Sequence, residues 1–521
     1  MRLPVVIPTV AWTRYTLLTV WTHRASGVLL HPTSFPSPDG IGDLGAEARQ
    51  FLDFLHASGV SVWQILPLQP VGPGDSPYSG ISAFAGNPLL ISLEGTRFTD
   101  GQPSGSPIVF SRARAQKLRR LQEFARLRRA DLREREALAL YREREQQWLD
   151  DFALFATSRA LFEGRPWTEW PSELARRDPA ALNELRVTQR DAYEDHCFLQ
   201  LTFDRQWQAL RREASTRGIR VLGDVPIFVT HDSADVWAHP HLFDLDHAGL
   251  PRLVAGVPPD YFSATGQLWG NPIYRWDRMA AEHYDWWSRR VERTLTHCDA
   301  IRLDHFRGFA ACWAVEAHER TAERGRWLAG PGGAFFQAIE RRAGQRLPIV
   351  AEDLGTISPD VVEMRRALGY PGMRILQFAF GSDAGNPFLL AAAANPYLPH
   401  NHVPDCVVYT GTHDNDTTRG WYESLSAGEQ HIVRSYLGVS GVDIAWDLVR
   451  AALMSVASLA VVPLQDLLSL GSESRMNLPG TPDGNWTWRY DPGAVNRGIA
   501  ERLRTLNHLY GRSMPPRAPA E

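Results

Sequence analysis

The chain has 521 residues, of which 44% are apolar and 22% charged, a composition typical of globular proteins with one large or two to three smaller domains. Its net charge of -4 and its pI near 6.5 exclude the strongly basic surface that nucleic acids and anionic membranes require. We therefore expect neither a nucleic-acid nor a membrane partner.

Both ends of the chain are predicted to lie outside the folded region. Residues 1–23 are apolar, but Pro4, Pro8 and Arg14 interrupt them, and they lack the small-residue cleavage site of a signal peptide. We expect a disordered extension over 1–23 and a flexible tail over 511–521.

The cysteines indicate a reducing compartment. They are scattered and form no CxxC pair, so the sequence argues against a disulfide framework and a zinc site. We expect buried thiols in a cytoplasmic protein at all four positions: Cys197, Cys298, Cys312 and Cys406.

In chain order, a turn-rich loop over 31–45 precedes a helical pattern over 46–59 and a strand over 61–68. From Ser111 to Leu161 the sequence is rich in Arg and Glu, with apolar residues at helical spacing: Leu118, Leu121, Phe124 and Leu127. We expect a helical insertion over about 96–195 with a solvated face, the alternative being a surface that binds a partner.

From about residue 195, helical patterns alternate with short apolar strands. This alternation is typical of parallel strands joined by crossover helices, and we place the strands at 220–229, 299–306, 348–355, 373–380 and 406–415. Several of them end at an acidic residue. In (β/α) barrels this is the end that carries the active site.

The strand AIRLDHF carries charges that a buried strand would normally lack. Arg302 and Asp304 are two residues apart and share one face, whereas Ile301 and Leu303 face the helices. The guanidinium can keep Asp304 ionised and oriented, as a covalent nucleophile requires. Taken alone, this Arg-x-Asp pattern is a weak signal, and it favours a structural ion pair.

Other carboxylates end neighbouring strands: Glu352 in VAEDLG, Asp414 in TGTHDNDT and Asp224 in GDVPIF. A retaining glycosidase needs one carboxylate as nucleophile and a second, with a raised pKa, as acid and then base. A metal centre at HDND is the competing interpretation, but no HExxH motif or second histidine cluster supports it.

The segment 256–272, GVPPDYFSATGQLWGNP, contains glycines, prolines and three aromatic residues. Aromatic rings stack on the apolar faces of sugars, and glycines permit the backbone turns of a mobile loop. We expect a substrate-covering loop here, with packing against the core as the alternative. For NWTWR at 485–489 we favour packing.

These motifs, in this order, resemble the amylomaltase, or 4-α-glucanotransferase, family, also called disproportionating enzymes. The resemblance runs from about 24 to 510 and includes SGVLLHPTS, GDSPY, GDVPIFV, RLDHFRGF, AEDLG, YTGTHDNDT and RMNLPGTPDGNWTWR. It implies a (β/α)8 TIM barrel of the α-amylase clan with inserted, mostly helical subdomains and no C-terminal β-sandwich.

The resemblance also implies roles. Asp304 matches the nucleophile, Glu352 the acid/base and Asp414 the carboxylate that stabilises the transition state. The residues that match substrate contacts are Tyr78, Asp224, Tyr261, Phe262, Gln267, Trp269, Arg302, Asp353 and His413. No metal or organic cofactor is implied.

The implied activity is transfer of a glucan from an α-1,4-glucan donor, such as a maltooligosaccharide, amylose or starch, to the 4-hydroxyl of an acceptor glucan or glucose. Cyclisation of long amylose is an additional reaction that the resemblance allows. The rivals are an α-glucan hydrolase of the same clan and an inactive glycan-binding protein. We expect a monomer or a weak homodimer.

The sequence departs from the family at three places: residues 1–23, the segment 381–401, which is lengthened, and the segment 312–327. None includes a catalytic carboxylate.

Overall fold

The computed structural model describes residues 23–513 except 73, 99–101, 260–262, 356, 381–394 and 482. Most of the expected N-terminal extension, most of the expected tail and most of the lengthened segment 381–401 lie outside the described residues.

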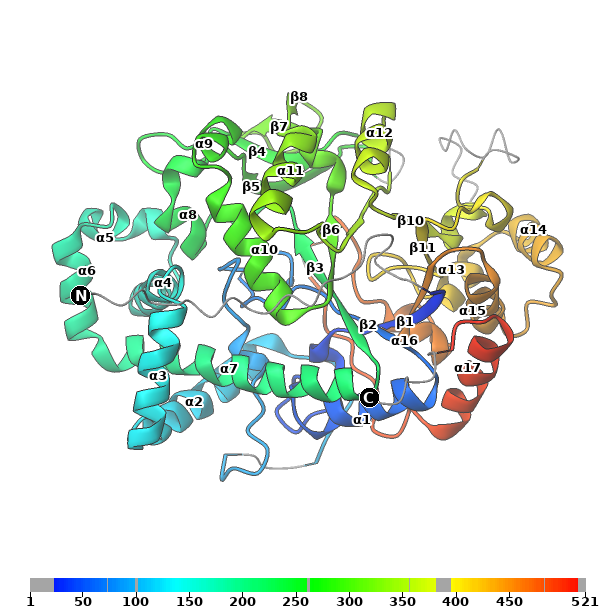
Figure 1. The fold of residues 1–521 in the computed structure, drawn as a ribbon, viewed down its shortest axis with the longest axis horizontal. Helices are drawn as coiled ribbons and strands as arrows, with labels where there is room; N and C mark the ends of the chain where they lie inside the picture. The colour runs from blue at the N-terminus through cyan, green and yellow to red at the C-terminus, as the bar shows by residue number, and fades with distance from the viewer. Residues whose placement is uncertain are drawn as a thin grey trace.

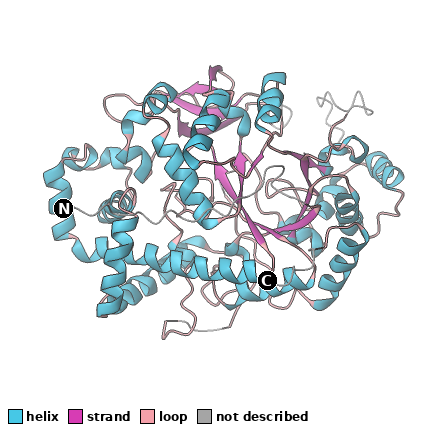
Figure 2. Ribbon diagram, viewed as in Figure 1, coloured by secondary structure: helices cyan, strands magenta, loops and turns pink. Residues whose placement is uncertain are grey.

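The centre of the molecule is a barrel of eight parallel strands surrounded by helices (Figures 1 and 2). The neighbour order is β10-β11-β12-β1-β2-β3-β6-β9, and the N–H of Ala351 donates to the carbonyl of Pro371 at 2.9 Å where the ends of the sheet meet. This confirms the predicted (β/α)8 architecture. The strands are β1 (Ala25–Leu29), β2 (Val62–Gln64), β3 (Arg220–Pro226), β6 (Ala300–Asp304), β9 (Ile349–Ala351), β10 (Gly372–Ile375), β11 (Cys406–Tyr409) and β12 (Leu459–Pro463).

The composition of these strands explains their position. β11 reads CVVY and β12 reads LAVVP, and every residue of both is buried. Strands that are buried on both faces need apolar side chains on both, whereas a half-exposed strand would alternate. Ile301 and Leu303 on β6 are buried as predicted. All four cysteines are free thiols and buried, also as predicted.

Amphipathic helices cover the barrel. In α1 the buried residues are Ala48, Phe51, Leu52, Phe54 and Leu55, which form one stripe. Helices outside the region between β2 and β3 are α1 (Ala46–Ala57), α8 (Ala234–Ala238), α9 (Trp276–Ala281), α10 (Asp285–His297), α11 (Gly332–Ala343), α12 (Pro359–Leu368), α13 (Thr418–Ser424), α14 (Ala427–Leu437), α15 (Ile444–Met454), α16 (Leu464–Leu467) and α17 (Arg497–Leu509).

A helical region separates β2 from β3, and its far end, with α5 and α6, lies to one side of the barrel in Figure 1. The predicted apolar stripe over 118–127 is partly wrong, because Leu121 is buried but Leu127 is 43% exposed. The stripe of α2 runs through Ala113, Lys117, Leu121 and Ala125 instead. The helices are α2 (Phe110–Arg128), α3 (Leu132–Arg144), α4 (Leu149–Leu161), α5 (Ser172–Ala175), α6 (Pro179–Thr188) and α7 (Arg190–Thr216).

Lys117, the lysine of this chain, is fully buried on α2. Its Nζ lies 3.4 Å from Asp39 and 3.1 Å from Asp43, and Arg120 contacts Asp39 at 2.8 Å. Buried charges persist when they are paired. This cluster therefore attaches α2 to the loop that follows β1.

A second, antiparallel sheet lies beyond the carboxyl ends of β3 and β6, with the order β5-β4-β7-β8. The segment 256–272, predicted as a substrate-covering loop, includes the end of β4 and the whole of β5, which form a hairpin; the glycines and prolines obscured this strand pattern. The strands are β4 (Leu253–Val257), β5 (Gln267–Pro272), β7 (Ala311–Glu316) and β8 (Gly325–Ala329).

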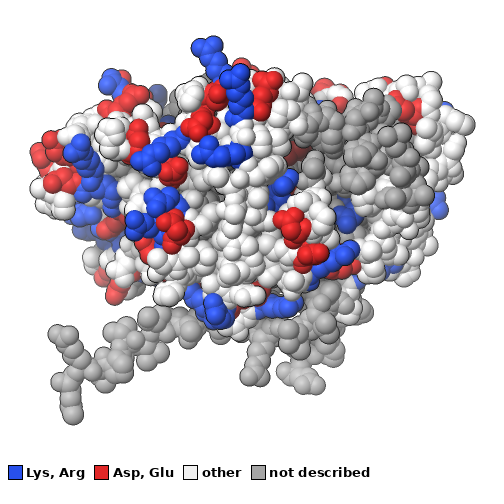
Figure 3. All heavy atoms as spheres, turned by 90° about the horizontal axis from the view of Figure 1, so that it is seen from above, with Lys and Arg blue, Asp and Glu red and all other residues white. Residues whose placement is uncertain are grey.

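Within the described residues, every named strand belongs to one of these two sheets, so the part of the chain after β12 adds helices and loops but no β-sandwich. None of the helices in the described part of the chain is long and apolar enough to span a membrane. On the face shown in Figure 3, basic and acidic groups are interspersed.

Candidate active site

The predicted carboxylates meet at the carboxyl ends of the barrel strands. Asp224 lies on β3, Asp304 ends β6, Glu352 directly follows β9, and Asp414 lies in the loop after β11. Parallel strands bring their carboxyl ends to one edge of the sheet, which is why residues far apart in sequence converge here.

Arg302 is the centre of the cluster. It stands opposite Asp224 in the β3–β6 register, and its Nη1 donates to both Asp224 oxygens at 2.9 and 2.8 Å. Its Nη2 lies 2.8 Å from Oδ1 of Asp304. Arg302 is 3% exposed, so this is both the structural ion pair and the orienting pair that the sequence left as alternatives.

An aromatic group borders this cluster. The Tyr78 hydroxyl donates to Oδ2 of Asp224 at 2.7 Å, and its ring stacks on His413 with centroids 5.1 Å apart. Trp486 lies 5.9 Å from both rings. The expectation of packing for NWTWR holds for Trp486, which is buried, although it packs against predicted sugar-binding residues.

Backbone donors hold the Glu352 carboxylate. The N–H of His305 donates to Oε2 at 2.8 Å and that of Leu354 to Oε1 at 2.7 Å. His305 adopts the left-handed conformation, with φ of 51°, which a non-glycine residue takes at some cost in energy. The strained backbone of His305 is therefore the part of the chain that directs an N–H group toward Glu352.

The electrostatics differ from what the ion pair alone suggests. Burial raises the pKa of Asp304, and the neighbouring carboxylates Asp224, Glu352 and Asp414 add to this effect while Arg302 opposes it. Burial also raises the pKa of Glu352, with Arg302 and the two backbone donors in opposition. One guanidinium serves several carboxylates, so the pair retains a proton more readily than two isolated acids would.

Asp414 is held by residues that sequence reasoning missed. The Asn477 amide donates to its Oδ1 at 2.6 Å, and Arg475 donates to its backbone carbonyl at 2.6 Å. His413 Nε2 lies 3.4 Å from its Oδ2. Asn477 and Arg475 belong to RMNLPG, which matches the family, but nothing local in that motif shows that it folds back onto the loop after β11.

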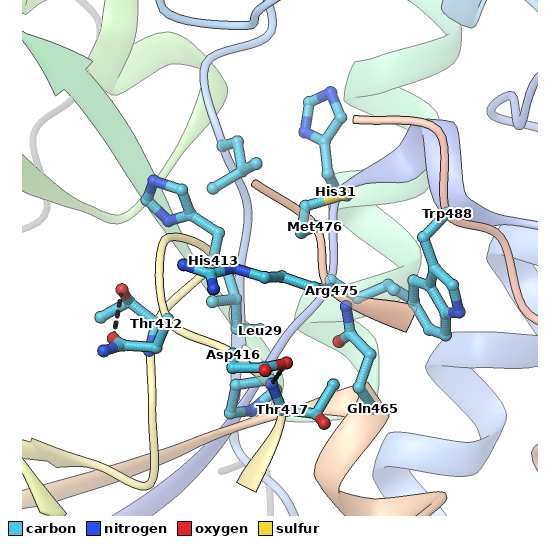
Figure 4. A pocket seen from close by; sticks show the side chains of 14 residues that line it. Leu29, His31, Thr412, His413, Asp416, Thr417, Gln465, Arg475, Met476 and Trp488 are labelled. Carbon is cyan, nitrogen blue, oxygen red and sulfur yellow. Dashed lines mark hydrogen bonds between the residues drawn. The ribbon is translucent and has the colours of Figure 1, made fainter. Parts of the chain in front are cut away.

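A small cavity lies behind His413. Its volume is about 20 Å³, enough for a single water molecule. Figure 4 shows the β11–α13 loop, with Thr412 to Thr417, on one side, and Gln465 and Trp488 on the other. It therefore lies beneath the site and is too small to hold a sugar.

Residues of the β4–β5 hairpin reach the site from above. Trp269 is 37% exposed, meets the His305 ring edge-on at 4.8 Å, and donates from Nε1 to Gln267 at 3.2 Å. Tyr261 and Phe262 lie outside the described residues.

Asp353 is the predicted contact that the structure does not bring to the others. Its carboxylate accepts the Met373 N–H at 2.7 Å and lies 3.1 Å from Arg365 and 3.7 Å from Arg374. It is buried in the barrel wall, and its role toward substrate stays a prediction.

A search of the described residues for clusters of His, Cys, Asp and Glu with the geometry of a metal site finds none. The metal interpretation of HDND gains no support from that part of the chain. His413 and Asp414 contact each other instead, and the pKa of His413 is lowered, chiefly by burial.

Comparison with known proteins identifies the family. The 4-alpha-glucanotransferase family model matches residues 30–495. The chain is 48% identical over 500 residues to the 4-alpha-glucanotransferase of Thermus thermophilus, covering 93% of this chain and 98% of the relative. It is 43% identical over 509 residues to the chloroplastic/amyloplastic 4-alpha-glucanotransferase of Solanum tuberosum, covering 94% and 86%.

Solved structures agree. The amylomaltase from Streptococcus agalactiae in complex with acarbose superposes with a TM-score of 0.88 at 35% identity, covering 94% of this chain and all of that one. The fold, the arrangement of carboxylates and the extent of these matches agree, and the chain belongs to the 4-alpha-glucanotransferase family.

Proposed function

We propose that this enzyme cleaves α-1,4-glucosidic bonds in maltooligosaccharides, amylose or starch and transfers the glucan to the 4-hydroxyl of an acceptor glucan or glucose. The reaction retains the anomeric configuration through a double displacement. The observation that carries the proposal is the pairing of Asp304 with Glu352, one held by a guanidinium and the other by two backbone N–H groups.

In the first step Asp304 attacks the anomeric carbon while Glu352 protonates the departing oxygen. The raised pKa values of both groups favour one retained proton between them. The 2.8 Å contact between Arg302 and Asp304 favours ionisation of Asp304, so the proton resides on Glu352. Asp304 is then a nucleophile and Glu352 an acid.

Asp414 binds ring hydroxyls more tightly in the oxocarbenium-like transition state than in the ground state. Asn477 fixes the direction of its carboxylate, so little reorganisation accompanies the reaction. The predicted contacts around the sugar at the cleavage point are Tyr78, Asp224, Arg302 and His413. Asp353 would act on the acceptor side indirectly, by fixing the position of the carboxyl end of β9.

In the second step Glu352 removes a proton from the acceptor 4-hydroxyl, and that oxygen displaces Asp304. Transfer outcompetes hydrolysis when an acceptor fills the site and water is excluded. We assign this exclusion to the segment 256–272, with Gln267 and Trp269 on β5 and Tyr261 and Phe262 between the strands. No metal or organic cofactor takes part. Cyclisation of long amylose would use the same steps, with the donor's own free end as acceptor.

We place the enzyme in the cytoplasm as a monomer or weak homodimer. The four buried thiols are compatible with a reducing compartment.

The test is the product profile of maltotriose. We expect glucose together with longer maltooligosaccharides, with no net gain in reducing ends, because each glycosidic bond that is broken is replaced by a new one to the 4-hydroxyl of an acceptor. A steady rise in reducing ends without longer products would instead establish the α-glucan hydrolase of the same clan.

A further inference from the structure

The outward face of the small sheet carries a row of apolar side chains. Gly256 pairs with Leu268 on one side and with Trp313 on the other, and Trp313 pairs with Trp327. Residues directly opposite each other on neighbouring strands project from the same face. The neighbouring Ala255, Cys312 and Ala314 belong to the main core. Trp313 instead packs against a small separate cluster of Val254, Val315 and Ala322, so this row lies on the face of the sheet that is turned away from the main core.

Trp327 is held rigidly although it is not part of the core. The Arg307 guanidinium lies over its ring at 4.0 Å from the centroid, and Trp313 meets it at 5.3 Å and 64°. Trp313 is itself anchored, since its Nε1 donates to the carbonyl of Ala322 at 2.9 Å. Trp327 nevertheless stays 43% exposed. A large, fixed and exposed aromatic side chain is typical of a binding surface.

Arg307 places this surface on the Glu352 side of the site. It follows Asp304 by three residues, and the intervening His305 donates its backbone N–H to Glu352. Burial lowers the pKa of Arg307, and Asp360, in the first turn of α12, opposes this shift. The first turn of α12 therefore lies near Arg307.

We propose that Arg307 and Trp327 form a binding subsite for the acceptor glucan, beyond the glucose ring that meets Glu352. The proposal rests on the proposed function, because Glu352 is the group that faces the leaving and incoming sugars. The C–H face of a glucose ring packs on the exposed indole, and the planar guanidinium donates to its hydroxyls. The subsite serves acceptors long enough to reach it and has no contact with free glucose.

The test measures two labelled acceptors with the intact enzyme and amylose as donor. In Trp327→Ala we expect the KM for labelled maltopentaose to rise about tenfold, which corresponds to about 1.4 kcal/mol. The KM for labelled glucose and both kcat values stay unchanged. Trp327→Phe keeps a flat ring and recovers most of the affinity for maltopentaose.

Two further variants separate binding from damage to the fold. Arg307→Lys keeps the charge but loses the planar donors, so it also raises the KM for maltopentaose alone. Leu140→Ala removes an apolar side chain on α3 that is 69% exposed and leaves both KM values unchanged.

A KM for maltopentaose that is unchanged in Trp327→Ala, or that rises equally for both acceptors, overturns the subsite. If Trp327→Ala does not fold, the Arg307→Lys result decides in the same way. A wild-type enzyme that incorporates neither label while reducing ends accumulate refutes the transfer reaction itself, which is a distinct outcome.

Discussion

Two buried arginine–carboxylate clusters in this molecule have opposite electrostatic outcomes. Between α7 and α10, Arg293 donates to both oxygens of Asp204 at 2.8 Å, and His297 and Tyr141 also contact that carboxylate. Burial alone would raise the pKa of Asp204, but Arg293 and His297 outweigh it and hold the pKa well below its usual range.

At the barrel mouth the carboxylates outnumber the cation. Arg302 contacts both Asp224 and Asp304, and Glu352 and Asp414 add further negative charge. Burial, together with these carboxylates, therefore raises the pKa of Asp304 although a guanidinium contacts it. The comparison teaches that the number of carboxylates per cation, rather than the presence of an ion pair, separates a stabilising cluster from a reactive one.

The largest expected effect comes from Asp304→Ala. Removing the nucleophile should lower transfer by at least about 10⁴-fold. The fold should persist, because Arg302 keeps Asp224 as a partner and one carboxylate of a crowded group is lost. At neutral pH the melting temperature should stay the same or rise, since folding raises the pKa of Asp304 and so disfavours its charged form.

Product analysis and thermal melting of Asp304→Ala and Asp304→Asn provide the measurement. Residual transfer above about one per cent in both variants would remove Asp304 from the role of nucleophile.

Asp204→Asn tests the cluster between α7 and α10 and should have the opposite result, a loss of stability without a loss of activity. It leaves Arg293 buried without its anionic partner, which costs about 3–5 kcal/mol of unfolding free energy. The kcat of the folded enzyme should not change. Urea unfolding gives the stability and initial rates give the kcat.

The matched control is Asp53→Asn, which removes an exposed carboxylate 2.8 Å from Arg217 and should cost less than about 1 kcal/mol. A loss that small for Asp204→Asn as well would mean that the buried pair contributes little.

The smallest expected effect is a change in the free energy of unfolding at acidic pH. Burial lowers the pKa of His31 and of His305 to about 3, whereas an unfolded histidine binds a proton near pH 6.5. The unfolded state therefore binds more protons as the pH falls from about 6.5 toward 3, and each such histidine costs about 1.4 kcal/mol per pH unit. Asp204, with its lowered pKa, begins to lose its contribution only below about pH 4.

Urea midpoints between pH 7 and 4.5 combine two opposed contributions, because the buried histidines lower stability as the pH falls, whereas Asp304 and Asp235, whose pKa values are raised to about 8 and about 6, increase it. The histidine contribution is therefore read from the difference between variants. On acidification the midpoint of His305→Gln should fall less, or rise more, than that of the wild type, and Leu140→Ala, which removes no titratable group, should leave the slope unchanged. Equal slopes in the wild type and in His305→Gln would contradict a neutral, buried His305.

The sequence predicted those parts of the fold that a local pattern encodes. Six barrel strands follow from apolar runs bounded by turns, and the convergence of Asp304, Glu352 and Asp414 follows from parallel topology. β1 and β12 were not predicted as strands, because the sequence of neither was distinguished from the motif beside it. The hairpin β4–β5 was missed because Gly256, Gly266 and flanking prolines mask the period of two.

The missing parts of the site depend on tertiary contacts. Asn477 lies 63 residues from Asp414 in sequence, and no local signal connects them. Likewise Trp327 lies on a strand that no pattern predicted, and its stacking with Arg307 depends on how β8 packs beside the 3-10 turn after β6. The shift in the pKa of Asp304 could not be predicted, because it depends on which acids converge around one guanidinium.

The burial of Lys117 has a practical consequence. With the chain's lysine enclosed by two aspartates under α2, acylating reagents that modify lysine amines find none at the surface. Coupling to activated supports through lysine will fail in the folded state. A lysine introduced at an exposed position, such as Val442 with 90% exposure, would give one accessible lysine for attachment besides the α-amino group of the chain.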